Sequence, residues 1–225
     1  MRGGPGSIRP ALAKVCGVEG YRHGDELRET LRTNLSGFER VAADGTGLRH
    51  AAVALAIAGD DEGRACFILT RRSSKLKRHA AQWALPGGRL DDDETVEDAA
   101  LRELVEEIGL ALPREDVIGV LDDYPTRSGF LITPVVVWAP MTPSFVADAS
   151  EVASVHLVPL DSLDEPDVPR LIDGTEPDRP IIQIPLYGRY VHAPTAAILY
   201  QLREAGLHGR PTRVAHFDQP VFAWK

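Results

Sequence analysis

Three glutamates near the middle of the chain have the type and spacing of metal ligands. Glu103, Glu106 and Glu107 occupy positions i, i+3 and i+4, so a helix of about 3.6 residues per turn places them on one face. Carboxylates this close repel one another, and near the end of a helix they also meet the negative end of its dipole. Hard divalent cations such as Mg2+ bind oxygen ligands of this kind. The cluster therefore predicts a divalent metal site, whereas the competing interpretation is a solvated acidic face.

The helix that must position these glutamates is predicted by its apolar residues and its end signals. A second face carries residues four apart that would pack against a core, namely Val96, Ala100, Leu104 and Ile108. Gly109 follows as a left-handed C-cap. Three acids suit the positive end of the dipole at the predicted N-terminus and could cap it: Asp91, Asp92 and Asp93.

The segment from Gly88 to Leu110 resembles the signature of the Nudix hydrolases. That signature is a glycine, five residues, a glutamate, seven residues, Arg-Glu, an aliphatic residue, any residue, Glu-Glu, any residue, a glycine and an aliphatic residue. The chain matches every fixed position, with Gly88, Glu94, Arg102, Glu103, Leu104, Glu106, Glu107, Gly109 and Leu110. The resemblance implies an α/β fold, an α/β/α sandwich with a mixed central sheet. It also implies Mg2+-dependent hydrolysis of a diphosphate linked to a nucleoside or similar group.

The resemblance assigns expected roles in metal binding. Glu106 and Glu107 would bind the metal, which is Mg2+ with Mn2+ as a substitute, and Glu103 would be a further ligand or the base that activates water. The carbonyl of Gly87 is a candidate ligand as well, because a residue without a side chain lets the backbone approach an ion closely. The expected reaction is attack of a metal-activated water on one phosphorus.

Arg102 and Glu94 are expected to support these ligands and to act with them in catalysis. The guanidinium offers a fixed fork of donors that can hold a glutamate, and such support orients metal ligands. Many relatives use an additional acid from a later loop, and Glu151 is the candidate in this chain. The competing interpretation of Glu151 is a surface residue at a strand end.

Composition narrows the class of protein. With 225 residues, 44% of them apolar, the chain can bury a full core. Its net charge of -8 argues against a nucleic-acid partner but permits a small anionic substrate. Cys16 and Cys66 do not suggest a disulfide framework. No apolar run approaches the roughly 20 residues of a membrane span, and no secretory signal opens the chain, so no membrane contact and a cytoplasmic location are expected.

The expected organisation is one domain. Residues 1–22 form an irregular segment whose start, MRGGPGS, is natural or a cloning remnant, and residues 23–225 form a single domain with a helical N-terminal addition and a C-terminal extension. Helices are predicted at 25–43 and 194–206, and strands at 50–59, 65–71, 116–124, 130–139, 151–160 and 181–187. A loop is expected at 172–180. The apolar tail could add an edge strand or form a homodimer interface.

A basic segment leads directly into Gly87 and Gly88, which are expected to form a turn before the helix and are called the glycine turn. Residues 70–88 read TRRSSKLKRHAAQWALPGG, so their side chains are placed to meet phosphates. The substrate contacts expected from this segment are Arg72, Ser73, Lys77 and His79, and Arg127 is a further candidate from the turn PTRSG. A solvated basic loop and an ordinary turn are the competing interpretations.

This segment also resembles the motif of coenzyme A pyrophosphatases, which reads LLTxRS, three residues, Arg, three residues, Gly, three residues, FPGG. The agreeing positions are Leu69, Thr70, Arg72, Ser73, Pro86, Gly87 and Gly88. Lys77, Ala81 and Leu85 replace the motif's Arg, Gly and Phe, and lysine loses the bidentate fork of arginine. Together with TRSGFLITPVV and VHAPTAAIL, the resemblance spans most of residues 50–205. It implies coenzyme A or acyl-CoA as substrate, coenzyme A being split into 3',5'-ADP and 4'-phosphopantetheine.

Two kinds of alternative stay open. Other Nudix substrates are ADP-ribose, dinucleotides and damaged nucleoside triphosphates. A different class of function is a catalytically silent Nudix domain that binds a nucleotide as a sensor or a protein as a scaffold. The presence of Glu103, Glu106 and Glu107 together argues against the silent domain.

Overall fold

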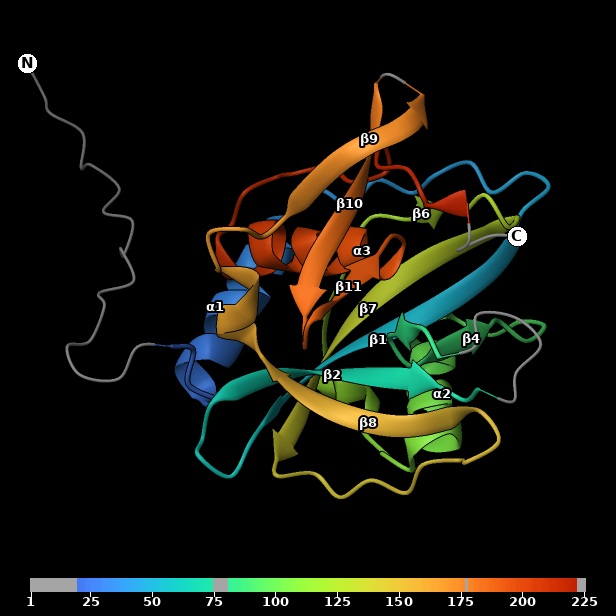
Figure 1. Cartoon of the computed structure of the whole chain (residues 1–225). Helices are drawn as coiled ribbons and strands as arrows, with labels where there is room; N and C mark the ends of the chain where they lie inside the picture. The colour runs from blue at the N-terminus through green and yellow to red at the C-terminus, as the bar shows by residue number, and fades with distance from the viewer. Residues whose placement is uncertain (1–19, 75–80, 177, 222–225) are drawn as a thin grey trace, which may run out of the picture.

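The fold is organised around one long parallel strand pair. The computed structural model describes residues 20–74, 81–176 and 178–221 (Figure 1). In its middle, β1 (Arg49–Gly59) runs parallel to β7 (Phe130–Met141). The other pairings of this sheet are antiparallel, so the sheet is mixed. The predictions for Cys16, Lys77 and His79 lie outside the described residues.

The described residues give this sheet eight strands. Its continuous order is β3-β2-β1-β7-β5, while β4 pairs with β1, β6 with β7 and β8 with β2. These strands are β2 (Ala65–Arg72), β3 (Trp83–Ala84), β4 (Gly87–Arg89), β5 (Val117–Val120), β6 (Tyr124–Pro125) and β8 (Val152–Pro159). One edge of β1 has two partners, because β4 pairs with residues 51–53 and β2 with residues 57–59. Gly87 pairs with Val53, at the end of the stretch of β1 that pairs with β4 and before the stretch that pairs with β2.

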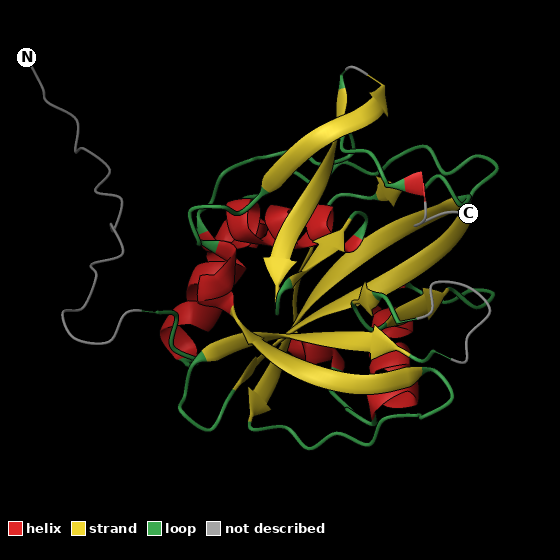
Figure 2. Cartoon of the chain, viewed as in Figure 1, coloured by secondary structure: helices red, strands yellow, loops and turns green. Residues whose placement is uncertain are grey.

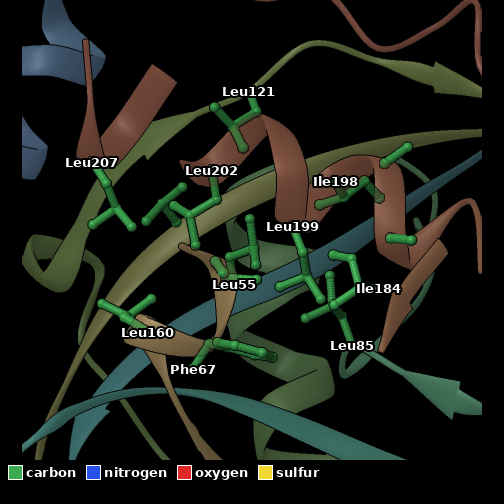
Figure 3. Packing of buried hydrophobic residues seen from close by; sticks show 14 of the residues in the cluster. Leu55, Phe67, Leu85, Leu121, Leu160, Ile184, Ile198, Leu199, Leu202 and Leu207 are labelled. Carbon is green, nitrogen blue, oxygen red and sulfur yellow. The ribbon is translucent and has the colours of Figure 1, made fainter. Parts of the chain in front are cut away.

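Alternate residues of β1 face two different layers. On one face, Ala52, Ala54, Ala56 and Ala58 share a buried cluster with the apolar residues of α2 (Val96–Ile108). On the other face, Leu55 and Ile57 belong to a core that includes residues of α1 (Asp25–Ser36) and α3 (Thr195–Gln201) (Figure 3). Helices therefore cover both faces of a mixed sheet, and the predicted α/β/α sandwich is confirmed.

A second, smaller sheet stands next to α3 (Figure 2). Its strands are β9 (Arg170–Glu176), β10 (Arg179–Leu186) and β11 (Arg189–His192), which pair antiparallel in the order β11-β10-β9. The prediction of a loop at 172–180 is therefore wrong, because its described residues belong to the hairpin of β9 and β10. Its Asp, Gly and Pro residues indicate a loop locally, but Leu171 and Ile172 pair with Ile182 and Ile181 of a partner that is long enough to hold them in a hairpin.

Helix boundaries differ from the predicted ones for local reasons. α1 ends at Ser36, short of the predicted residue 43. Gly37 is its C-cap, and the next N–H, of Phe38, binds the carbonyl of Leu35 three residues back in place of the helical partner four residues back. Three short helical turns complete the described elements: η1 (Arg114–Asp116), η2 (Leu160–Leu163) and the π-helical η3 (Leu202–Leu207), which continues α3. None of the described helices is long and apolar enough to cross a membrane.

Two strand predictions also change. The strand predicted at 116–124 is divided between β5 and β6, because Asp122 and Asp123 between them are buried in ion pairs with Arg213 and Arg40. In the described part of the C-terminal tail, Asp218 makes an isolated bridge in place of the predicted edge strand.

Candidate active site

Helix α2 begins after its predicted caps. The hydroxyl of Thr95 accepts the backbone N–H of Asp98 at 3.2 Å, which is the N-cap geometry of a threonine one residue before the helix. The three acids at 91–93 precede this point, so the prediction that they cap the helix is wrong. Gly109 ends the helix with φ of 70°, as predicted. Ala100, Leu104 and Ile108 are fully buried, which fixes the acidic face away from the core.

Arg102 binds three glutamates of the acidic face. Its Nε and Nη2 donate to Glu94 at 2.9 and 3.1 Å. Its Nη1 donates to Glu103 and Glu106, each at 2.8 Å. Nη2 also donates to the carbonyl of Arg89 at 2.9 Å, which ties α2 to β4. The hydrogen bond from Arg102 lowers the pKa of Glu94, because it favours the charged carboxylate.

Glu107 is the buried member of the cluster. Only 4% of its side chain is exposed, whereas 59% of Glu106 is. Burial raises the pKa of Glu107 to about 8, although Arg72 and the backbone N–H of Gly87 favour its charged form. Arg72 Nη1 lies 4.0 Å from Glu107 Oε1. Burial also raises the pKa of Glu103, against the hydrogen bond from Arg102. A bound cation would stabilise both carboxylates in their charged forms.

Gly87 and Gly88, where a turn was predicted, are part of strand β4, which brings its backbone against these carboxylates. A Cβ on Gly88 would overlap the carboxylate of Glu103, and one on Gly87 would overlap the backbone of Ala52 and Val53. Gly88 pairs with Ala52 and therefore faces α2, whereas Gly87 and Arg89 face the other side of the sheet. Glycine is thus required at position 87, where the neighbour is backbone, whereas a side chain at position 88 would displace the Glu103 carboxylate.

The segment that carries Glu151 lies beside the same cluster. The backbone N–H of Ser73 donates to the carbonyl of Glu151 at 2.7 Å, and Ser73 is buried. The negative charge of Glu151 raises the pKa of both Glu103 and Glu107, as a smaller cause than burial. Glu151 and Ser73 are therefore brought to the glutamates of α2 from distant parts of the chain.

The donor set fits a hard divalent cation. Glu103, Glu106 and Glu107 supply carboxylate oxygens from one rigid helix, and the burial of Glu107 leaves its charge without full solvation. In the described part of the chain, no three His, Cys, Asp or Glu side chains already converge on one ion position. Arg102 holds Glu103 and Glu106, so a cation would compete with it for these two side chains.

A cavity of about 460 Å³ adjoins the glycine turn. Gly87, Gly88 and Arg72 line it together with residues of β1, β7 and β11. Its lining includes three arginines, Arg72, Arg89 and Arg189, and among the described residues no carboxylate, although the chain has 33 acidic and 25 basic residues. Three aromatic side chains also line it: Trp83, Phe130 and Tyr190. Such a cavity suits an anionic ligand with an aromatic or apolar part.

The helix, the turn and the cavity coincide with a family match. The model of the NUDIX domain matches residues 48–182. The chain belongs to the Nudix family. Membership supports a pyrophosphatase that acts on nucleoside-diphosphate-linked compounds, and Nudix hydrolases generally use divalent metals such as Mg2+ or Mn2+. The matched residues run from the residue before β1 into β10, so β11, which lines the cavity, lies beyond them.

Curated relatives of this Nudix domain carry the name "Uncharacterized Nudix hydrolase NudL". One from Citrobacter koseri is 39% identical over 134 residues, which cover 58% of this chain and 70% of the relative. One from Cronobacter sakazakii is 43% identical over 95 residues, which cover 42% of this chain and 50% of the relative. The solved Nudix hydrolase RenU from M. smegmatis is 29% identical, with a TM-score of 0.44, and the match covers 53% of this chain and 75% of that chain. The chain thus spans between half and 70% of these two curated relatives.

Arg127 is not among the residues that line the cavity of this Nudix domain. Its guanidinium donates to Asp218 at 2.9 Å and to Glu176 at 2.8 Å, so two carboxylates neutralise its charge. The predicted substrate contact at Arg127 is therefore not met by its placement. Its neighbours Thr126 and Ser128 line the cavity instead.

Several residues that line the cavity were not predicted from the sequence as substrate contacts. Arg89 could have been predicted, because it follows two glycines and the alternation of side chains along a strand turns it to the face opposite Gly88. Arg189 and Tyr190 had a weaker one: they follow the turn at Tyr187 and Gly188, both with positive φ, and begin the alternating run RYVH. Trp83 and Phe130 resembled ordinary apolar strand residues.

Proposed function

We propose that this Nudix domain hydrolyses the diphosphate of coenzyme A or acyl-CoA with Mg2+ as its metal. The observation that carries the proposal is the position of Arg72, which lines the cavity and also lies 4.0 Å from Glu107. Arg72 thus lies between the cavity, whose described lining has no carboxylate, and the glutamate cluster of α2. A diphosphate bound at this junction would contact Arg72 on one side and the acidic cluster on the other.

Glu103, Glu106 and Glu107 would hold the Mg2+, with the carbonyl of Gly87 as a further ligand and Mn2+ as a substitute. When bound, the metal would polarise the phosphoryl oxygens and lower the pKa of a bound water. The Gly87 peptide is adjacent to the cluster, because its N–H binds Glu107. Arg102 and Glu94 would orient Glu103 and Glu106 through the hydrogen bonds described above.

Hydrolysis needs a base for the attacking water. Glu103 is the first candidate, because its raised pKa suits proton acceptance and Gly88 leaves its carboxylate room beside the turn. Glu151 is the second candidate. It comes from the segment before β8, and its negative charge raises the pKa of Glu103 and Glu107. The water oxygen forms a bond to one phosphorus, its proton goes to the glutamate, and the bridging P–O bond breaks. The leaving phosphate keeps the electron pair of that bond.

The substrate proposal rests on the residues around the motif at 69–88. Arg72 of that motif lies at the junction. Ser73 is buried beside Glu151 and is not among the described residues that line the cavity. Lys77 and His79 stay proposals outside the described residues. The aromatic and apolar lining would accept the adenine and the pantetheine arm, while the arginines would bind phosphates. The proposed partner is therefore a small diphosphate compound.

One panel of assays tests the function. The wild-type protein and Mg2+ are incubated in separate reactions with coenzyme A, acetyl-CoA, ADP-ribose, NADH and nucleoside triphosphates. The products of each reaction are separated by chromatography. We expect 3',5'-ADP and 4'-phosphopantetheine from coenzyme A, and no product after the double substitution Glu106→Gln and Glu107→Gln. Equal rates on all compounds would remove coenzyme A as the favoured substrate. No hydrolysis of any compound would support the silent sensor or scaffold.

A further inference from the structure

Arg49, Phe130 and Arg89 form a basic aromatic patch on the cavity side of the sheet. Arg49 and Phe130 are register partners in the parallel pair of β1 and β7. Arg89 pairs with Ala51, the next residue of β1 on the same face. The guanidinium carbon of Arg49 lies 3.9 Å from the centroid of the Phe130 ring, and that of Arg89 lies 5.4 Å from it. Two cations therefore stand against one ring.

These arginines are not neutralised by a carboxylate in the part of the chain that the structure describes. Arg49 donates to the carbonyl of Ser128 at 3.1 Å, and neither Arg49 nor Arg89 is in one of the ion pairs between described residues. Arg102 and Arg127, by contrast, each bind at least two carboxylates. Stacking on a ring leaves the in-plane N–H groups of a guanidinium available for an anion. Two like charges around one ring thus make a site that an anion would complete.

The patch lies within one molecule's reach of the proposed catalytic centre. Arg89 directly follows Gly88, whose α-carbon lies against Glu103. Arg89, Phe130 and Gly88 line the same cavity. One ligand in this cavity can therefore place a diphosphate at the glycine turn and a second anion at the patch.

We propose that this patch binds a second phosphate of the substrate, a monoester phosphate carried by its nucleoside. The patch would then select nucleoside-diphosphate compounds that bear this additional phosphate over those that lack it. A dianionic monoester accepts several N–H bonds and gains more from two guanidinium groups than a neutral ribose hydroxyl does. The inference rests on the proposed function, because it takes the diphosphate to lie at the acidic cluster.

Binding without metal tests the patch apart from catalysis. Calorimetry in the presence of a chelator compares adenosine 3',5'-bisphosphate with AMP for the wild type, Arg49→Ala, Arg89→Ala and a control, Arg32→Ala. Arg32 is an exposed arginine of α1 whose carboxylate contact is Glu29 at 3.7 Å. We expect the wild type to prefer the bisphosphate by roughly tenfold or more, each patch variant to reduce that preference by about tenfold, and the control to keep it. Thermal unfolding of each variant verifies that it is folded.

A wild type that binds both nucleotides equally, or patch variants that keep the full preference, would overturn the inference. Steady-state kinetics then distinguish a failure of this inference from a failure of the proposed function. The quantities compared are kcat/KM for coenzyme A and kcat/KM for 3'-dephospho-coenzyme A. If coenzyme A is not hydrolysed but the bisphosphate preference is present and depends on Arg89, the proposed substrate fails and the patch stands. If the wild type hydrolyses coenzyme A and 3'-dephospho-coenzyme A with equal kcat/KM, and the patch variants change neither value, the inference about the patch is wrong and the proposed hydrolase function stands.

Discussion

Two neighbouring residues of β4 face opposite kinds of chemistry. Gly88 faces α2, where Glu103 and its neighbours gather negative charge, whereas Arg89 faces a cavity whose described lining has arginines and no carboxylate. The acidic face comes from one segment of about twenty residues on a single helix and its turn. The cavity comes from strands that are distant in sequence, β1, β4, β7 and β11. The pleat of one strand turns Arg89 away from the glutamates, and the two regions meet at Arg72, which lines the cavity and lies 4.0 Å from Glu107.

The two regions also differ in how their charges are compensated. On the acidic face, Arg102 binds Glu94, Glu103 and Glu106, and Glu107 remains buried with a raised pKa. At the cavity, the guanidinium carbon of Arg89, which lines it, lies 5.4 Å from the ring centroid of Phe130, and that of the neighbouring Arg49 lies 3.9 Å from it. In the proposed function, a cation would complete the acidic face and an anion would complete the cavity. This difference predicts that substitutions on the acidic face mainly affect turnover, and those in the cavity mainly affect substrate binding.

The largest effect is expected for Glu107→Gln. Amide replaces carboxylate with little change in shape, so the loss of a metal-binding charge should lower kcat by about a hundredfold to a thousandfold. Steady-state kinetics over a range of Mg2+ concentrations measures this loss. Recovery of the full kcat at high Mg2+ would show that Glu107 tunes metal affinity alone, and full activity at ordinary Mg2+ would break the assignment of this face to metal.

The same substitution should stabilise the protein when a chelator removes metal. Folding raises the pKa of Glu107 from 4.5 to about 8, so between these values the folded protein holds a proton that the unfolded chain releases. The wild type therefore loses stability as pH rises from about 4.5 to about 8, and glutamine is free of this effect. Thermal unfolding should give Glu107→Gln a gain in Tm that grows over this window and is constant above it. The exposed position on the same face, Glu106→Gln, is measured alongside as the matched control.

The next largest effect is expected for Gly88→Ala. The new methyl group would overlap the carboxylate of Glu103, and displacement of a catalytic group by about 1 Å can lower kcat by about a hundredfold. The control is Gly24→Ala, where a Cβ meets no atom within 4 Å. Activity of the two variants is compared at saturating substrate. Equal activity would show that the turn tolerates the methyl group and that Glu103 need not lie against it.

The local origin of the acidic face explains why it could be predicted from sequence. The i, i+3 and i+4 spacing of its glutamates and the cap at Gly109 are properties of one helix, and the structure keeps both. Even here, the N-terminus was predicted at the wrong residues. Aspartate is by type at least as good a cap as threonine, but in the structure it is the hydroxyl of Thr95 that accepts the Asp98 N–H.

The cavity could be predicted only in part, because its residues meet through pairing between distant strands. Arg72 came from a motif, but Arg49 and Phe130 become neighbours only when β1 and β7 align in register. The placement of Arg127 could not be read locally for a related reason: its partners, Asp218 and Glu176, come from the C-terminal tail and β9. The segment at 172–180 was predicted as a loop because its hairpin partner is not visible in the local sequence pattern.

A smaller effect, at the junction of the two regions, is expected for Arg72→Ala. If Arg72 acts as a phosphate contact, its removal should raise KM about tenfold with a smaller change in kcat, because such a contact contributes similarly in ground and transition states. The conservative variant Arg72→Lys should recover part of the affinity, since it keeps the charge and loses the fork. An unchanged KM with a lower kcat would instead place Arg72 with the acidic face, as a partner of Glu107.

The smallest effect is expected for Thr95→Ala, which removes the N-cap of α2. Loss of such a cap costs about 1 kcal/mol of stability, which corresponds to a fall of about 2–4 °C in Tm for a chain of this size. Activity should change less than about twofold, because the glutamates lie at the other end of a helix that Ala100, Leu104 and Ile108 hold against the sheet. Thr95→Ser is the matched control and should keep the wild-type Tm, since its hydroxyl can still accept the Asp98 N–H. A large loss of activity with normal Tm would mean that the cap positions the glutamates directly, and the acidic face would then depend on the local end of its helix more than on packing.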